Sequence, residues 1–161
     1  MSAILSSCRK FRYRLTRDVN KSGKVTIAYF GINPSTADEK KDDPTVRRWR
    51  GFTERNNGVK FIIGNVFAFR ATDVGELARA EDPVGPENML HIDGIISEAD
   101  ILVPCWGSRN KLPRELWGHL DMFVDKLNCS GKPVKCFGKT VSNDPEHPLM
   151  LADSTPKCTT R

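Results

Sequence analysis

The chain has 161 residues, of which 39% are hydrophobic and 28% charged, and its formal net charge is +5. This length and composition fit one domain, residues 1–161, in which residues 154–161 form a loose tail. A membrane protein is excluded because no apolar run approaches the roughly 18–20 residues of a span, whereas the positive charge permits a nucleic acid or nucleotide partner without requiring one.

Predicted strands and helices alternate along the chain. In chain order the pattern predicts an edge strand at 11–19, a buried strand at 25–32, a helix that begins at Asp43-Pro44 and stops at 56–58, a buried strand at 59–67, a helix at 85–99, a buried strand at 101–106, a helix at 113–127 and a short strand at 134–137. This order predicts an α/β fold with a mostly parallel central sheet and helices on both faces.

The five cysteines contain no C-x-x-C pair and are odd in number. A disulfide framework, a zinc site and an iron–sulfur site are therefore not expected. We expect no metal, no cofactor and a cytoplasmic protein with free thiols. Nothing in the sequence indicates an oligomeric state.

Polar segments follow the predicted strands, starting with Asn33-Pro34-Ser35 and continuing at residues 70–73, 106–108 and 138–140. In an open parallel sheet ligands bind beyond the carboxyl ends of the strands, so these segments are expected to share one edge. Asn65 lies within its strand, near the end, where its side chain can still reach the cleft.

Two asparagines are candidate binding residues. The amide of Asn33 can position a water but cannot deprotonate it, and a plain Asn-Pro turn is the favoured alternative on the tetrapeptide alone. Asn65 is polar within a buried strand, where it must find partners, and its amide matches the edge of a nucleobase. The alternative for Asn65 is a satisfied core residue.

The charged candidates each have a plain structural alternative. His147 is the one histidine predicted in a loop, where its imidazole can donate to a developing negative charge, although most such histidines are surface residues. Arg47 and Arg48 begin a basic helix that suits either a phosphate backbone or a solvated face. The aspartates at 38, 42 and 43 fit a solvated turn better than a metal site, with Asp43 as a helix cap.

The chain also resembles the uncharacterised bacterial and phage family DUF1643 over nearly its whole length. The matching segments are Tyr13-Arg14-Leu15, Asn33-Pro34-Ser35-Thr36-Ala37-Asp38, Asp42-Asp43-Pro44-Thr45 with Arg47-Arg48, Asn65-Val66-Phe67-Ala68-Phe69-Arg70-Ala71-Thr72, Gly85-Pro86-Glu87-Asn88, Trp106-Gly107 and His147-Pro148-Leu149.

The same landmarks are similar, in type and order, to the uracil-DNA glycosylase superfamily. Gly31-Ile32-Asn33-Pro34-Ser35 resembles the water-positioning motif of its mismatch-specific branch, Trp106-Gly107 the strand-end pair, and His147-Pro148 the start of its His-Pro-Ser loop. The resemblance implies a three-layer α/β sandwich. It also implies roles for catalysis (Asn33, His147), base binding (Phe52, Asn65, Ser35) and phosphate binding (Arg47, Arg48, Arg70).

The first hypothesis is therefore a uracil-DNA-glycosylase-like protein that acts on or binds a nucleobase, with hydrolysis of the N-glycosidic bond in DNA or in a nucleotide as the candidate reaction. Two alternatives remain. One is a non-catalytic protein that sequesters a nucleotide or modified base, which the lack of a carboxylate at position 33 and the altered final loop, with Leu149 in place of Ser, both favour. The other is an interaction protein that retains only the fold, which would be contradicted if Asn33, Asn65 and His147 lined one cleft.

Overall fold

The computed structural model describes residues 1–152 and the short strand at 159–160. Most of the predicted tail, including Cys158, lies outside the described residues. Two sheets are described, one of five strands in the order β1-β2-β4-β3-β5 and one of two strands, β6 and β7. The strands are β1 (Ser2–Leu5), β2 (Arg12–Asp18), β3 (Val25–Gly31), β4 (Gly58–Asn65), β5 (Ile101–Pro104), β6 (Lys135–Cys136) and β7 (Thr159–Thr160).

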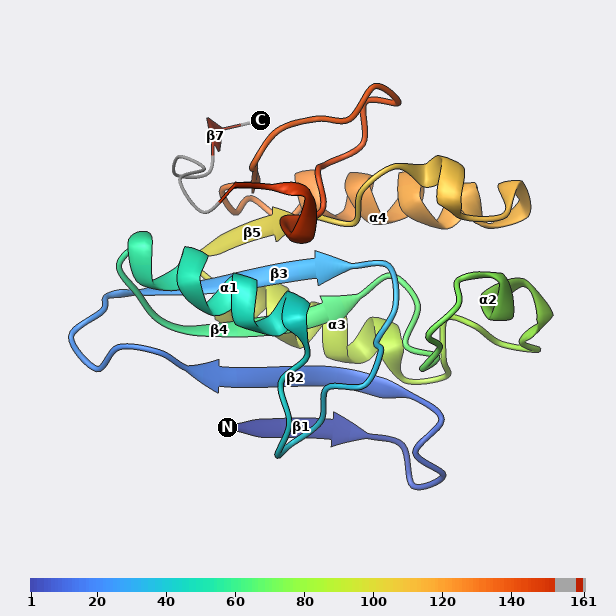
Figure 1. Ribbon diagram of the computed structural model, residues 1–161, viewed down its shortest axis with the longest axis horizontal. Coiled ribbons are helices and arrows are strands. Elements are labelled where there is room, and N and C mark those ends of the chain that lie inside the picture. Colours follow the sequence, from blue (N-terminus) through green and yellow to red (C-terminus); the bar gives the residue numbers. More distant parts are fainter. Residues whose placement is uncertain (153–158, 161) are drawn as a thin grey trace.

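Four α-helices occur within the described part of the chain (Figure 1). They are α1 (Pro44–Arg55), α2 (Gly75–Arg79), α3 (Asn88–Glu98) and α4 (Trp117–Asn128), accompanied by the single-turn 3₁₀ helices η1 (Arg109–Lys111), η2 (Arg114–Leu116) and η3 (Pro148–Met150). The mixed α/β class, the three longer helices and the buried strands β3, β4 and β5 confirm the sequence-based expectation, whereas β1 and α2 were not predicted.

The prediction of a mostly parallel sheet is wrong, because the sheet is mixed. β3, β4 and β5 run parallel, but β2 is antiparallel to β4 and β1 is antiparallel to β2. The reason lies in the connections. Residues 19–24 between β2 and β3 are too few for the crossover of a dozen or more residues that a parallel pair requires, so the chain must reverse.

The central strands are buried on both faces by helices. Tyr29 and Ile63 belong to a core that α1 completes through Trp49, whereas Phe30 and Leu102 belong to a second core with α3 and α4. Adjacent residues of a strand point to opposite faces, which is why β3 and β4 read as continuous apolar runs. Figure 1 shows α1 crossing one face of the sheet while α3 lies behind it.

The start of α1 is fixed by its local sequence, as predicted. The Asp43 carboxylate accepts a hydrogen bond from the Val46 backbone N–H at 2.9 Å, and Pro44 occupies the first helical turn. This capping places the first turn of α1 beside the carboxyl ends of β3 and β4. The helix therefore brings both its cap and its first side chains to the edge of the sheet where ligands are expected.

Candidate functional site

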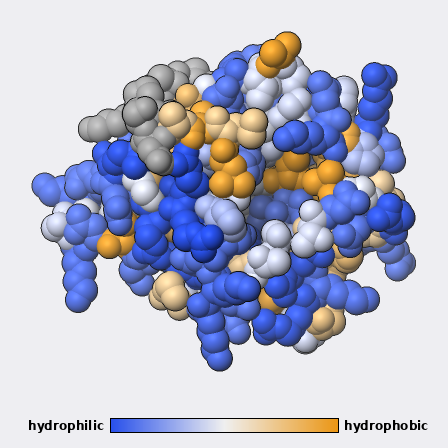
Figure 2. All heavy atoms as spheres, viewed as in Figure 1, coloured by the Kyte–Doolittle hydropathy of each residue, from blue (hydrophilic) through white to orange (hydrophobic). Residues whose placement is uncertain are grey.

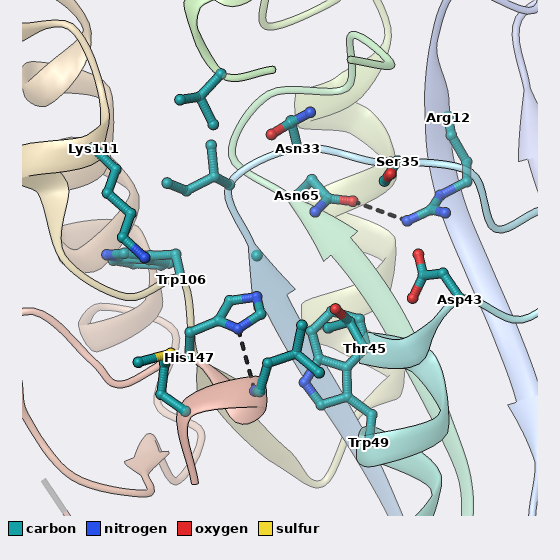
Figure 3. Close-up of a pocket in the computed structure, with 15 residues that line it drawn as sticks. Arg12, Asn33, Ser35, Asp43, Thr45, Trp49, Asn65, Trp106, Lys111 and His147 are labelled. Atoms are coloured by element: carbon teal, nitrogen blue, oxygen red, sulfur yellow. Dashed lines mark hydrogen bonds between the residues drawn. The ribbon is translucent and has the colours of Figure 1, made fainter. Parts of the chain in front are cut away.

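A cavity of about 340 Å³ opens at the carboxyl ends of the parallel strands. Four of the predicted site residues line it together: Asn33, Ser35, Asn65 and His147 (Figure 3). Its volume lies at the small end of the range usual for ligand pockets. On this side of the molecule hydrophilic residues cover most of the surface, and hydrophobic ones gather near the centre (Figure 2).

Asn33 follows β3 and has a fixed amide orientation. Its Nδ2 donates to the carbonyl oxygens of Pro34, at 3.1 Å, and Ala71, at 2.7 Å. Because a carbonyl oxygen only accepts, the nitrogen must face these two groups, and the Oδ1 is left as the acceptor at the cavity. An acceptor at this position can take a hydrogen bond from a water and leave the lone pairs of that water free.

Asn65 ends β4 and has the opposite polarity. Its Oδ1 accepts from the Arg12 guanidinium at 3.4 Å, and the residue is only 3% exposed. A guanidinium has no acceptor, so the amide cannot be reversed. The Nδ2 has no acceptor among the described residues and is free to donate to a ligand (Figure 3).

Arg12 is a cavity residue that the sequence reading missed. It lies on β2, is 3% exposed, and donates to the Ala37 carbonyl oxygen at 2.8 Å. Burial lowers the pKa of Arg12 to about 10, and the nearby Asp43 opposes that shift. The side chain therefore keeps its charge at neutral pH, with no carboxylate of the described chain at ion-pair distance.

His147 presents a donor to the cavity. Its Nδ1 accepts the backbone N–H of Leu149 at 3.2 Å, so the neutral ring carries its proton on Nε2. Burial, assisted by Lys111, lowers the pKa of His147, and Asp43 acts in the opposite direction. In Figure 3 the ring extends from its loop toward the space below Asn65.

The segment that carries His147 is anchored on the loop after β5. Gly107 donates its backbone N–H to the Pro145 carbonyl at 2.8 Å. It adopts a φ of +82°, and a Cβ there would stand 3.2 Å from the Cβ of His147. Asp144, 1% exposed, accepts from the backbone N–H and the Nε of Arg109, each at 2.9 Å. The Trp106-Gly107 pair thus helps to place the histidine.

Asp43 combines its capping role with a place in the cavity wall. Its Oδ1 is the cap acceptor, and in Figure 3 its carboxylate points toward the side of the cavity that Arg12 and Asn65 occupy. Thr45 and Trp49, from the first turns of the same helix, also line the cavity. Asp43 is therefore a cavity residue as well as a helix cap. The Asp-Pro-Thr motif at the start of the helix, next to the strand ends, could have indicated this place in the site.

Phe52 is placed outside the cavity, which corrects its assignment as a base-stacking residue. The ring is 1% exposed and packs on Phe137 with centroids 4.3 Å apart. Residues three apart share a face of a helix but are displaced along its axis. Because α1 begins at the cavity, Trp49 reaches the site and Phe52 lies one turn beyond it.

The three predicted phosphate-binding arginines also lie outside this cavity. Arg47 is exposed and donates to the Asp42 carbonyl oxygen at 3.0 Å. Arg48 donates to the carbonyl oxygens of Pro148, at 3.3 Å, and Leu151, and so connects α1 to the His147 loop. Arg70 lines a second cavity, next to Ser35. Arg47 and Arg48 thus lie away from the cavity and contact local backbone carbonyls, and their predicted phosphate-binding role stays a prediction.

In the described part of the chain no group of three or more His, Cys, Asp or Glu side chains is placed to hold a metal ion. The same residues include no helix long and apolar enough to cross a membrane.

The family model described as "Protein of unknown function (DUF1643)" matches residues 12–149. No curated protein and no solved structure matches the chain.

Proposed function

The chain belongs to the DUF1643 family of proteins of unknown function, and we propose that it binds a nucleobase in this cavity and hydrolyses the N-glycosidic bond of that base in a nucleotide or in DNA. One observation carries the proposal: Asn33, Asn65 and His147, from three distant segments, line the same cavity. The proposal includes the three-layer fold of the uracil-DNA glycosylase superfamily. Because these three residues line one cavity, the alternative of an interaction protein that retains only the fold is disfavoured.

The polarity of the cavity supports a base that carries carbonyl oxygens. Asn65 offers an amide N–H, and His147 offers its Nε2–H. A base with carbonyl oxygens supplies acceptors for these two donors better than one with an amino group.

The proposed reaction uses three side chains. The bond between the sugar C1′ and the base nitrogen breaks, and its electron pair leaves with the base, whose anion the His147 Nε2–H stabilises. A water held by the Asn33 Oδ1 adds its oxygen to C1′, and its proton passes to the Asp43 carboxylate. Asp43 thereby supplies the basic group that the Asn33 amide lacks.

The test is an assay of base release from single- and double-stranded DNA containing uracil or modified pyrimidines, and from free nucleotides. His147→Ala should lower the rate by roughly 10²–10³-fold, because one preorganised donor to the leaving group is lost. His119→Ala, on α4 and outside the cavity, is the matched control. No base release from any of these substrates would contradict the proposed hydrolysis.

A thermal-shift titration with the same nucleotides separates catalysis from binding. Stabilisation without product would support the sequestering protein that lacks turnover. Stabilisation together with released base supports the hydrolase.

A further inference from the structure

A second cavity adjoins the first one across a shared residue. It measures about 380 Å³ and is lined by Ser35, Thr36, Arg70, Ala71, Thr72 and Glu76. Ser35 also lines the first cavity, so the two spaces lie on either side of the loop that follows β3. The proposed base reaction uses none of the other five residues.

Arg70 brings a positive charge to this second cavity without an internal use for it. Its backbone N–H donates to the Lys10 carbonyl at 2.9 Å, and its Nη1 makes one long contact, 3.4 Å, with the Arg9 carbonyl oxygen. No carboxylate of the described chain forms an ion pair with it. The backbone of Arg70 is therefore anchored, while most donors of its guanidinium stay uncommitted.

Three residues with hydroxyl groups line the same cavity as Arg70. The side chains of Ser35, Thr36 and Thr72 make no hydrogen bond with any described residue. An arginine with several hydroxyl donors is the set that recognises phosphate oxygens. Glu76 is the opposing charge at this cavity, and its Oε1 faces the backbone N–H of Asp73 at 3.4 Å.

The wall between the two cavities is fixed in position. Ala71 donates its backbone N–H to the Pro34 carbonyl at 3.1 Å and accepts the Asn33 amide at 2.7 Å. The loop after β3 is thus tied to the segment that bears Arg70. The tie holds the spacing between a group in one cavity and a group in the other, as a ligand that spans both would require.

We propose that the second cavity is a phosphate subsite, in which Arg70, Ser35, Thr36 and Thr72 hold the phosphate of the nucleotide whose base occupies the first cavity. The pairing of the two cavities rests on the proposed function, whereas the phosphate subsite itself does not. The substrate class is then a nucleoside monophosphate rather than a free base or a nucleoside.

The experiment measures binding of inorganic phosphate, of nucleosides and of their 5′-monophosphates by calorimetry and thermal shift. The wild-type chain should bind one monophosphate about tenfold or more tightly than its nucleoside. Arg70→Gln should abolish this advantage and leave nucleoside binding unchanged. Arg47→Gln, an exposed arginine outside both cavities, should keep the advantage.

Thr72→Val is a second variant with little risk to folding, because Thr72 is exposed. It should lose part of the advantage. Equal affinities for nucleoside and monophosphate, or an equal loss in Arg47→Gln and Arg70→Gln, would overturn the subsite and leave the base pocket standing. A third outcome is that inorganic phosphate stabilises the wild type and Arg47→Gln but not Arg70→Gln, while no nucleoside binds to the wild type. That outcome would support the phosphate subsite and contradict the proposed function.

A single-stranded trinucleotide distinguishes the source of the phosphate. Loss of affinity in Arg70→Gln for both the trinucleotide and the monophosphate assigns the subsite to the phosphate of the bound nucleotide itself. Loss for the trinucleotide alone would assign it to a neighbouring strand phosphate and contradict the monophosphate as substrate.

Discussion

At the scale of a single residue, Asp43 caps α1 and is proposed to accept a proton in base release, and two substitutions separate the cap from the proposed role. An Asn side chain caps a helix about as well as Asp, whereas Ala leaves the Val46 N–H unsatisfied at a cost of about 1 kcal/mol. Asp43→Asn should therefore destabilise the fold less than Asp43→Ala, yet abolish most base release because the carboxylate is gone. Urea denaturation and the release assay measure the two effects. Full release by Asp43→Asn would remove Asp43 from the chemistry.

His147 should give the stability of the fold a specific dependence on pH. Burial lowers its pKa in the folded state, so the folded chain binds a proton at lower pH than the unfolded chain does. As pH falls through the ordinary histidine value, only the unfolded chain gains the proton, and the folded state loses stability until its own lower pKa is reached. Above that window the imidazole is neutral in both states.

The measurement is the unfolding free energy of the wild type and of His147→Gln at about pH 7.5 and about pH 5. The stability of the wild type relative to the variant should decline as pH falls. A difference that is constant, or that grows on acidification, would contradict a lowered pKa of His147 in the folded state.

At the scale of elements, the segment that leads to His147 depends on a buried ion pair. Asp144→Ala would leave the Arg109 backbone N–H and Nε without their acceptor, and should cost about 1–3 kcal/mol. It should also lower base release, because the loop then holds His147 less well. Asp121→Ala is the matched control. Asp121 pairs with the same arginine at 3.0 Å but is 61% exposed, so its loss should cost under about 1 kcal/mol. Equal effects of the two variants on release would show that the buried pair does not position the loop.

Individual helices and strands also show which features the sequence could predict. The boundaries of α1 follow from a local cap and a local stop signal, and the strands β3 and β4 follow from dense apolar runs. For these elements, neighbouring residues in the sequence were sufficient for the prediction. Arg12 could not be assigned to the site, because its partner Asn65 lies 53 positions away and the two meet only through the pairing of β2 with β4. The mixed sheet was missed because the direction of a strand depends on the length of the connection that precedes it. Phe52 was misplaced because helical spacing predicts which face of α1 a residue occupies, but not how far along the helix axis it lies from the cavity.

At the scale of the whole molecule, several of the arginines behind the net charge of +5 are engaged inside the protein and are not open to a polyanion. Arg17 is 0% exposed and pairs with Asp42, and Arg12 is buried beside Asn65. Arg48 and Arg109 are likewise used to hold loops. These four arginines stabilise the fold, so fewer arginines are open at the surface than the sequence contains. We therefore expect a small anionic ligand rather than a long duplex.

The dependence of affinity on salt tests this view of the charge. A protein that makes six to ten phosphate contacts with duplex DNA loses roughly 10³–10⁵-fold in affinity between about 50 and about 200 mM salt, because condensed counterions are released. One phosphate bound at Arg70 involves no such counterion array, so the affinity for a mononucleotide should fall by about fourfold or less over the same range. Binding of a duplex, measured in parallel, should be weaker than that of the mononucleotide at the higher salt. A duplex that binds more tightly there, with a steep salt slope, would mean that surface arginines such as Arg47 track a nucleic acid backbone after all.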